Sequence, residues 1–471
     1  MNKLLASLCL LAASCLSVMA DVTLPAIFSD SMVLQRDKEV SVWGNANPGE
    51  SVTVSIKNDS SKTTADADGK WLVKLKPMAA GGSYTLKVQG DNTVSFTDVL
   101  VGEVWLCSGQ SNMQMPLAGW KDQPVEGSEE AIAAANYPNL RLFTVKRTMA
   151  AVPLYDCEGQ WSVCTPKLAG EFSATAFFFG RKLLKELDIP IGLIHSSWGG
   201  TPAEAWTSPD SLSRLDEFKE KVEQVRNVKD TTKKTKIFHF QASTVLYNGM
   251  IQPLVPYGLR GAIWYQGESN ASNAKLYRKI FPNMITNWRD VFKQGDFPFY
   301  FDQIAPFDYG DNTKGVEIRE VQRETLAKVK NIGMAVLMDK TTLKNIHPPY
   351  KKEAGERMAL WALAKDYGKD VVYSGPLYKK MKIEGNRIRL FFDNTGGGLD
   401  SKDKALTQFT ISGADNVAYE AEAKIDGHTL LVSSSKVKAP VAVQYGWSNV
   451  ALGSLFNKEG LPASSFRTDE W

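Results

Sequence analysis

Both ends of the chain show apolar and polar residues alternating with a period of two. Near the N-terminus the alternation recurs in 40–44, 51–56 and 83–88, between turns rich in Gly and Asp. Towards the C-terminus it returns in 387–392, 429–432 and 441–445. A period of two is typical of half-buried strands, and several short strands at this spacing indicate a small sandwich. We therefore expect a β-sandwich domain over residues 21–97 and a second β domain over residues 371–471.

Between residues 98 and 370 the pattern changes to continuous apolar runs separated by amphipathic segments. The expected strands cover 103–108, 191–195, 259–266, 298–304 and 334–338. Ser173 can cap a helix over 174–187, and a further helix is expected around 351–366. Strands that alternate with helices indicate a parallel α/β sheet, whose ligands gather at the carboxyl ends of the strands. Residues 210–236 are charged and lack a strong apolar stripe, which favours an exposed helical insertion.

The first 20 residues have the pattern of a secretory signal peptide. Lys3 precedes the apolar run Leu4–Leu16, and Val18-Met19-Ala20 ends in the small residues that signal peptidase accepts. The protein is therefore expected to be exported, either to the periplasm or outside the cell. Cys15 offers a less favoured alternative, an outer-membrane lipoprotein. No later stretch is long and apolar enough to cross a membrane.

Charge and composition exclude some partners. The net charge of the 471 residues is only +3, which gives no electrostatic reason to expect a nucleic-acid partner. No cluster of metal-binding residues and no Gly-rich phosphate loop is present, so no metal or other cofactor is expected. Cys157 and Cys164 flank a short polar loop and could form a local disulfide after export. Cys107, in an apolar run, is expected to be a buried inert thiol.

Three segments rich in Ser, Gly and amide residues follow expected strands. They are Ser108–Met113, Ser197–Thr201 and Gln266–Asn270. Because the carboxyl ends of parallel strands meet at one edge of a sheet, the three should converge. Ser111 is then an exposed candidate nucleophile, with backbone N–H groups and an amide side chain nearby to stabilise a tetrahedral oxyanion. Each segment by itself is explained equally well as a structural turn.

A serine nucleophile needs a base, and the chain has only four histidines. His195 lies within an expected strand, His239 at the end of the insertion and His428 in a β-turn of the last domain. A structural role is favoured for each of these three. His347 lies in a polar loop after the 334–338 strand, at the functional edge of the sheet, and is favoured as the base.

Taken together, these residues resemble the conserved blocks of the SGNH-hydrolase superfamily. More narrowly, the chain resembles the sialate O-acetylesterases (sialic-acid 9-O-acetylesterases). The resemblance rests on Gly109–Met113, Gly199-Gly200-Thr201, Leu246–Ile251, Trp264–Asn270, Gln303–Pro306, His347-Pro348, Gly460–Ala463 and the residues from there to Trp471. It extends over nearly all of the chain after the leader. It implies a flavodoxin-like parallel sheet between residues 98 and 370, flanked by the two β-sandwich-like regions.

The resemblance also implies catalytic roles. Ser111 matches the nucleophile and His347 the base. The oxyanion donors would be the backbone N–H groups of Ser111 and of Gly199 or Gly200, with Gly199 favoured, and the side chain of Gln266. One position departs from the pattern, because Lys344 stands where many SGNH enzymes have the aspartate that orients the histidine. Some sialate esterases similarly lack this aspartate and look like Ser-His dyads.

Something else must then accept the Nδ1 hydrogen of His347. The backbone carbonyl of Asn345 is the favoured acceptor, and Asp339 and Asp302 are candidate carboxylates from neighbouring strands. Candidate substrate-binding residues follow the strand ends: Gly200, Glu204, Trp206, Glu268 and Asn270. Packing explains Trp206 about as well.

The leading functional hypothesis is a secreted esterase that removes O-acetyl groups from sialic acids or sialoglycans through an acetyl-serine intermediate. Two alternatives remain open. One is an acetylesterase of xylan or another plant polysaccharide, since related SGNH families share these blocks. The other is a catalytically inactive carbohydrate-binding protein, which Lys344 makes conceivable.

Overall fold

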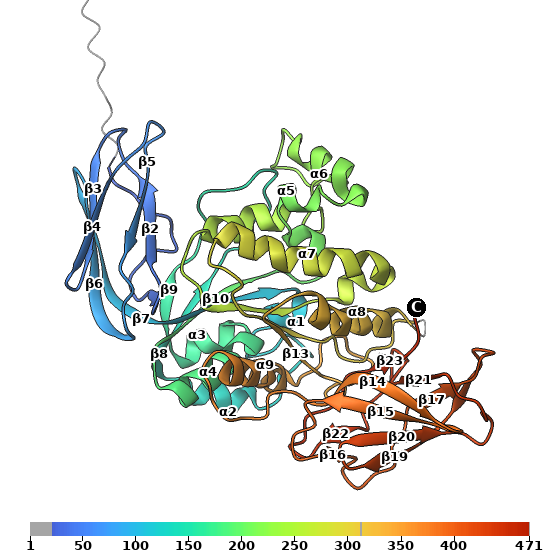
Figure 1. The fold of residues 1–471 in the computed structure, drawn as a ribbon. Helices are drawn as coiled ribbons and strands as arrows, with labels where there is room; N and C mark the ends of the chain where they lie inside the picture. The colour runs from blue at the N-terminus through green and yellow to red at the C-terminus, as the bar shows by residue number, and fades with distance from the viewer. Residues whose placement is uncertain (1–20, 311–312, 471) are drawn as a thin grey trace, which may run out of the picture.

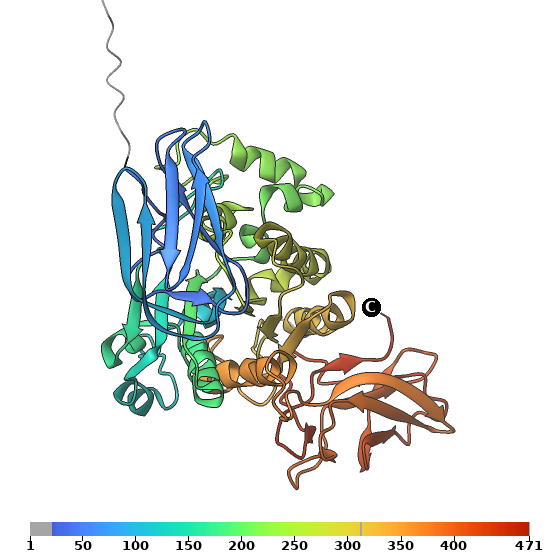
Figure 2. The ribbon, with the colours of Figure 1, turned by 60° about the vertical axis from the view of Figure 1, so that its left-hand side comes forward.

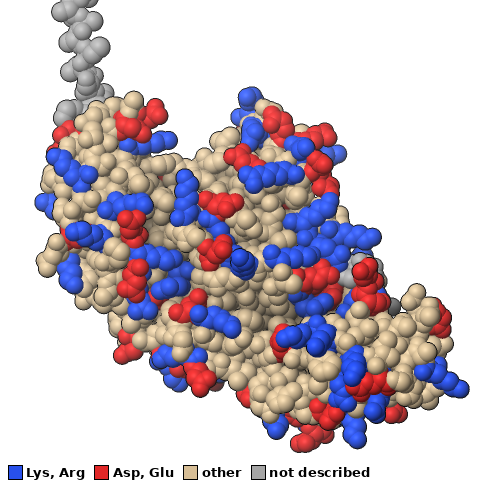
Figure 3. Space-filling view, viewed as in Figure 1, with Lys and Arg blue, Asp and Glu red and all other residues tan. Residues whose placement is uncertain are grey.

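The structure is a computed structural model that describes residues 21–310 and 313–470. The expected signal peptide and Cys15 lie outside the described residues. A β region at the N-terminus, a central α/β domain and a β region at the C-terminus follow one another across the molecule (Figure 1). Acidic and basic side chains are interspersed over the face seen in Figure 3. Within the described ranges no helix has the length and apolar character needed to cross a membrane.

The central domain is built on a parallel sheet. Its strands run in the order β8-β10-β7-β11-β12-β13, and β9 adds an antiparallel edge next to β8. The bounds are β7 Thr93–Gly109, β8 Tyr137–Thr144, β9 Trp161–Cys164, β10 Ile191–Ser197, β11 Gly261–Tyr265, β12 Phe299–Asp302 and β13 Ile332–Ala335. The five strands expected from the sequence are all present. The expected α/β fold with flanking β regions is confirmed.

The order of the strands explains where a site forms. After β7 the chain moves to β8 and β10 on one side, and it then crosses β7 to reach β11 on the other side. The connections therefore diverge at β7, and ligands bind at such a switch point, outside the carboxyl ends of the strands. The segments that follow β7, β10 and β11 are the three that the sequence singled out.

Helices cover both faces of this sheet (Figure 1). The helices α4 (Ala174–Leu187) and α9 (Lys351–Lys365) pack on one face, and α7 (Ala274–Phe292) and α8 (Lys314–Lys328) pack on the other. Side chains of β11 alternate between these layers, with Ile263 facing α4 and α9 and Trp264 facing α7 and α8. The expected cap of α4 is present, since the Ser173 hydroxyl accepts a hydrogen bond from the Ala176 N–H over 3.1 Å.

The N-terminal β region shares a strand with the central domain. The first part of β7 pairs with β6, and its second part, from Glu103 onward, pairs with β10 and β11 (Figure 2). The strand therefore runs without a break past residues 97 and 98. The other strands of this region are β1 Val33–Gln35, β2 Val40–Asn45, β3 Ser51–Ile56, β4 Asp59–Thr64, β5 Lys70–Leu75 and β6 Gly81–Gln89.

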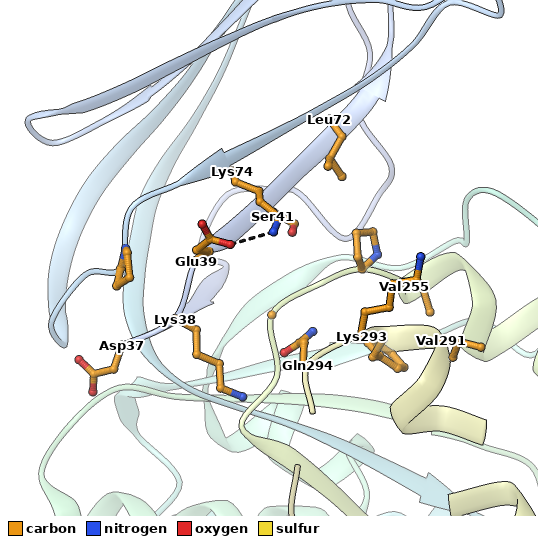
Figure 4. Close-up of a pocket in the computed structure, with 14 residues that line it drawn as sticks. Asp37, Lys38, Glu39, Ser41, Leu72, Lys74, Val255, Val291, Lys293 and Gln294 are labelled. Atoms are coloured by element: carbon orange, nitrogen blue, oxygen red, sulfur yellow. Dashed lines mark hydrogen bonds and ion pairs between the residues drawn. The ribbon is translucent and has the colours of Figure 1, made fainter. Parts of the chain in front are cut away.

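A cavity of about 770 Å³ lies where this β region meets the end of α7 (Figure 4). Glu39 and Lys74 form an ion pair of 2.8 Å at its wall, and the Lys38 ammonium donates to the carbonyl of Leu259. Its lining includes neither Ser111 nor His347. This cavity is therefore separate from the strand ends at which the candidate chemistry gathers.

The segment expected as an exposed insertion forms the short helices α5 (Pro209–Leu212) and α6 (Lys219–Arg226). They lie beyond α7 (Figure 1). Their outer surface is charged, but Phe218, Val222 and Val225 are buried against the core that α7 shares. The insertion is thus anchored by a narrow apolar stripe.

The C-terminal region is a second β-sandwich. One sheet has the order β14-β15-β20-β19 and the other β18-β17-β21-β23, with a small β16-β22 pair beside them. Residues such as Leu390, Val432, Val443 and Phe466 form the core. The strands are β14 Leu377–Glu384, β15 Arg387–Asp393, β16 Leu399–Asp400, β17 Phe409–Ser412, β18 Ala418–Glu420, β19 Glu422–Asp426, β20 Thr429–Ser433, β21 Ala442–Tyr445, β22 Phe456–Asn457 and β23 Phe466–Arg467.

The sequence left open whether Cys157 and Cys164 form a disulfide, and in the structure both thiols are free. Cys164 lies in β9 and is buried in the core that α4 and α9 share, whereas Cys157 packs against the core on the opposite side. The two sulfurs therefore belong to different layers. Cys107 is free and buried as expected, and burial raises the pKa of its thiol.

Candidate active site

Ser111 is placed by a tight turn at the end of β7. Gly109 has φ +140°, and a Cβ at this position would lie 2.2 Å from the carbonyl oxygen of Tyr265 on β11. Only glycine allows this close approach. Ser111 then begins the short helix α1 (Ser111–Gln114) and is partly exposed. Its N–H lies in the first helical turn, where N–H groups have no acceptor within the helix.

Gly199, which follows β10, packs directly against Ser111. A Cβ on Gly199 would lie 3.2 Å from the Cβ of Ser111. The Gly199 N–H, however, donates to the side-chain oxygen of Gln114 over 2.6 Å. Gly199 is therefore at the expected place. Its N–H can donate to an oxyanion only after its hydrogen bond to the Gln114 side chain is broken.

His347 is oriented by Gln123, not by the carbonyl of Asn345 as expected. Its Nδ1 lies 2.8 Å from Oε1 of Gln123. An amide oxygen only accepts, so Nδ1 carries the hydrogen and Nε2 is left as the proton acceptor. Trp120 packs edge-on against the imidazole at a centroid distance of 5.1 Å. Asn345 instead uses its side-chain oxygen to accept from the backbone N–H of His347.

Asn112 connects the segment of Ser111 to the segment of His347. Its amide nitrogen donates to the carbonyl of Ile346 over 3.0 Å and to the carboxylate of Glu268 over 2.6 Å. Its amide oxygen accepts from the Lys351 ammonium. Both N–H groups and the oxygen of this buried amide make hydrogen bonds, so the residues next to Ser111 and His347 are held together.

Three ionisable groups are buried in this part of the site. Lys351 and Glu268 hydrogen bond to Asn112, and the third is Asp302. Burial lowers the pKa of Lys351 to about 7, although the two carboxylates oppose this change. Burial likewise raises the pKa values of Glu268 and Asp302. The pKa of His347 is lowered to about 4, mainly by burial and further by the charge of Lys351. His347 is thus neutral at neutral pH and able to accept a proton.

Neither candidate carboxylate contacts the imidazole. Asp339 forms a bidentate ion pair with Arg357, with distances of 2.7 and 2.8 Å. Asp302 is fully buried, and its carboxylate oxygens make no hydrogen bond within the described chain. The group that orients His347 is therefore an uncharged amide.

Gln266 does not point its amide towards Ser111 as expected. The residue is fully buried, and its Nε2 donates to Oδ1 of Asn270 over 2.7 Å and to the carbonyl of Thr201 over 3.2 Å. Both N–H groups are engaged, so this structure gives no support for Gln266 as an oxyanion donor. It ties the end of β11 to the segment after β10.

Most of the candidate substrate-binding residues also have structural partners. Asn270 donates to Glu204, and Glu268 holds Asn112. Trp206 is fully buried and packs edge-on against Trp264, so packing is the right explanation for it. Gly200 is exposed next to Gly199, and its carbonyl accepts a hydrogen bond of 2.7 Å from the side chain of Gln241.

The remaining histidines do not reach this site. His195 is buried in β10 and hydrogen bonds to Ser197, and His428 hydrogen bonds to Thr395 in the C-terminal sandwich. His239 accepts from a backbone N–H in its own loop. Within residues 21–310 and 313–470, no group of three or more His, Cys, Asp or Glu side chains is arranged to hold a metal ion.

Comparisons with known proteins identify the family. The family described as carbohydrate esterase, sialic acid-specific acetylesterase matches residues 101–363. The chain belongs to this family. It is 35% identical to the sialate O-acetylesterase of Pongo abelii over 75% of this chain and 73% of that protein. It is 31% identical to the sialate O-acetylesterase of Mus musculus over 88% of both.

A solved structure is similar over almost the whole chain. A carbohydrate acetylesterase from Xanthomonas citri superposes with a TM-score of 0.87 and is 39% identical, over 96% of this chain and 100% of that one. The resemblance to sialate O-acetylesterases seen in the sequence is confirmed, and the protein is an esterase.

The sequence did not reveal the residues that hold His347. Gln123 and Trp120 lie in the loop after α1, and no strand end or motif marks them. Asn112 lies within the segment Ser108–Met113, and Lys351 begins the expected helix after His347, so their positions were a usable signal. Gln114 directly follows the resembling block Gly109–Met113, yet its contact with Gly199 depends on side-chain direction alone.

Proposed function

We propose that Ser111 and His347 form a catalytic dyad that removes O-acetyl groups through an acetyl-serine intermediate. The Ser111 hydroxyl attacks the acetyl carbonyl carbon, and its proton passes to Nε2 of His347. The tetrahedral intermediate collapses, and the sugar hydroxyl leaves with that proton. Water then attacks the acetyl-serine, His347 takes a proton from the water, and acetate leaves as Ser111 regains its hydrogen.

The observation that carries this proposal is the set of hydrogen bonds at Asn112. It joins the residue after Ser111 to the residue before His347, while Gln123 leaves Nε2 as the acceptor. The N–H groups of Ser111 and Gly199 are the proposed oxyanion donors. The Gly199 N–H is released when the developing oxyanion replaces the side-chain oxygen of Gln114, a weaker neutral acceptor.

The proposed substrates are O-acetylated sialic acids, free or in sialoglycans. Support comes from the mammalian relatives, which are named sialate O-acetylesterases. Acetylated xylan or another plant polysaccharide is the second candidate, because the Xanthomonas relative is named only as a carbohydrate acetylesterase. Export is also proposed, on the leader pattern of residues 1–20, with the periplasm or the medium as destination.

Two assays separate the possibilities. Hydrolysis of p-nitrophenyl acetate distinguishes an enzyme from an inactive carbohydrate-binding protein. Release of acetate from O-acetylated mucin sialic acid is then compared with release from acetylated xylan. The proposal predicts the larger kcat/KM on the sialic acid substrate, whereas a preference for xylan would favour the second candidate.

A further inference from the structure

A cationic side chain packs on Trp198, next to the glycine that contacts Ser111. Trp198 is the residue before Gly199, which packs against Ser111, and its N–H donates to the carbonyl of Gly109 over 3.2 Å. Arg147 lies over the indole of Trp198, with its guanidinium carbon 5.5 Å from the ring centroid. This contact links Arg147 to the backbone that flanks the proposed nucleophile.

The strand order explains how Arg147 reaches this point. It follows β8, which ends at the same edge of the sheet as β7 and β10, and the Val145 N–H donates to the carbonyl of His195 on β10. Phe240 stacks on Trp198, at a centroid distance of 5.5 Å and an interplanar angle of 16°. The indole is therefore fixed, and the guanidinium rests on a rigid surface.

Arg147 is exposed, and within the described residues it makes no ion pair. Its neighbour Lys146, by contrast, is paired with Glu158 over 2.6 Å. An aromatic ring attracts a guanidinium and restricts its orientation without neutralising its charge. The planar group then keeps its paired N–H donors, which match the two oxygens of a carboxylate.

We propose that Arg147 binds the carboxylate of the sugar and thereby determines specificity for acidic over neutral acetylated carbohydrates. This inference rests on the proposed function, since sialic acids carry a carboxylate that is ionised at neutral pH. Acetylated xylan has no such group on its acetylated sugar. Arg147 anchors the acidic end of the substrate while Ser111 attacks the acetyl group.

Two other exposed cations border the site. Lys121 is in the loop of Trp120 and Gln123, and Lys344 is in the loop of His347. In the part of the chain that the structure describes, neither is held against an aromatic ring. A free lysine is a flexible point charge, so it orients a carboxylate less well than a stacked arginine does. Lys121 and Lys344 are therefore tested as alternative binding residues for the substrate carboxylate.

The test compares an O-acetylated sialic acid with its carboxyl methyl ester, which lacks the negative charge. The kcat/KM values of both, and of p-nitrophenyl acetate, are measured for the wild type, Arg147→Gln, Arg147→Lys and the control Lys146→Gln. The wild type and Lys146→Gln should prefer the free acid by about tenfold or more, as is typical of a charge-assisted hydrogen bond. Arg147→Gln should remove that preference and leave p-nitrophenyl acetate hydrolysis and Tm unchanged, and Arg147→Lys should restore part of it.

The results that would contradict a role for Arg147 differ from those that would contradict the proposed sialic acid substrate. If the wild type prefers the free acid and Arg147→Gln keeps that preference, the role of Arg147 is wrong and the substrate assignment stands. If Lys121→Gln or Lys344→Gln loses the preference for the free acid and Arg147→Gln keeps it, that lysine, and not Arg147, binds the carboxylate. If the wild type hydrolyses acetylated xylan and not the sialic acid, both proposals fail.

Discussion

Asn112 donates a hydrogen bond of 3.0 Å to the carbonyl of Ile346, and this bond ties the start of α1 to the loop before α9. The residues on either side of the bond are Ser111 and His347, which come from segments more than 200 positions apart. Because the same amide also binds Glu268 and Lys351, one buried side chain helps to position both residues of the proposed dyad.

Asn112→Ala should therefore lower both activity and stability. Each buried group that loses a hydrogen bond costs about 1–3 kcal/mol, and the variant removes the bonds that Asn112 makes to Lys351 and Glu268. We expect a lower Tm together with a large fall in kcat. Asn287→Ala is a matched control, since Asn287 is also buried but binds Ser208 away from the site. It should lower Tm and keep kcat per folded molecule, and an equal fall in kcat would argue against a specific role for Asn112.

The pKa of His347 predicts the acidic limb of the pH profile. The imidazole accepts the Ser111 proton only when it is neutral, and its pKa is lowered to about 4. As the pH falls, kcat/KM should decrease to half of its plateau value at about pH 4. An apparent pKa of about 6.5 for this limb, the ordinary value for histidine, would contradict the buried environment of His347 beside Lys351.

Gln123→Glu should shift this limb to higher pH. A carboxylate at Nδ1 stabilises the imidazolium, so the pKa of His347 rises and protonation begins to remove the base at a higher pH. The same change at Gln224, on the exposed face of α6, provides the control and should leave the profile unchanged. An unaltered limb in Gln123→Glu would mean that Gln123 does not orient His347 in solution.

Gln266→Ala tests whether the buried amide is an oxyanion donor. Loss of such a donor typically lowers kcat about a hundredfold or more. In the structure Gln266 instead supports Asn270 and Thr201, so we expect a lower Tm and a smaller fall in kcat. A hundredfold fall in kcat at unchanged Tm would restore the oxyanion role that the sequence suggested.

Asp339→Asn and Asp302→Asn should each retain most of kcat. Asp339 is engaged by Arg357, so its replacement weakens that ion pair and lowers Tm. The pKa of Asp302 is raised by burial, which favours its neutral form, and an amide resembles that form in shape. Collapse of kcat in either variant, with circular dichroism unchanged, would indicate a carboxylate that completes a triad.

The strand ends could be predicted from the sequence because apolar runs, glycines and small polar residues mark them locally. Ser111, Gly199 and His347 lie in segments marked in this way and remain candidates, and the switch point at β7 brings the first two into contact. The direction of a side chain at a strand end is not marked in the same way. Gln266 and Trp206 both follow strands, yet both turn into the core.

The partner of His347 could not be predicted for a related reason. Gln123 is 224 residues away along the chain, in a loop with no periodic pattern, and only tertiary packing brings it to Nδ1. Local reasoning therefore chose an acceptor within the same loop, Asn345. Cys157 and Cys164 are a further example. They are close in sequence, but the structure packs them against two different hydrophobic cores.

The most direct measurement is the mass of the intact enzyme during turnover of an acetyl ester, with the modified peptide then identified. The dyad predicts an acetyl group on Ser111 that accumulates when its breakdown is slow and is absent from Ser111→Ala. That variant should also lose acetate release while keeping its Tm, because a partly exposed hydroxyl contributes little to stability. Near-normal acetate release by Ser111→Ala, or an acetyl group on another residue, would contradict Ser111 as the nucleophile.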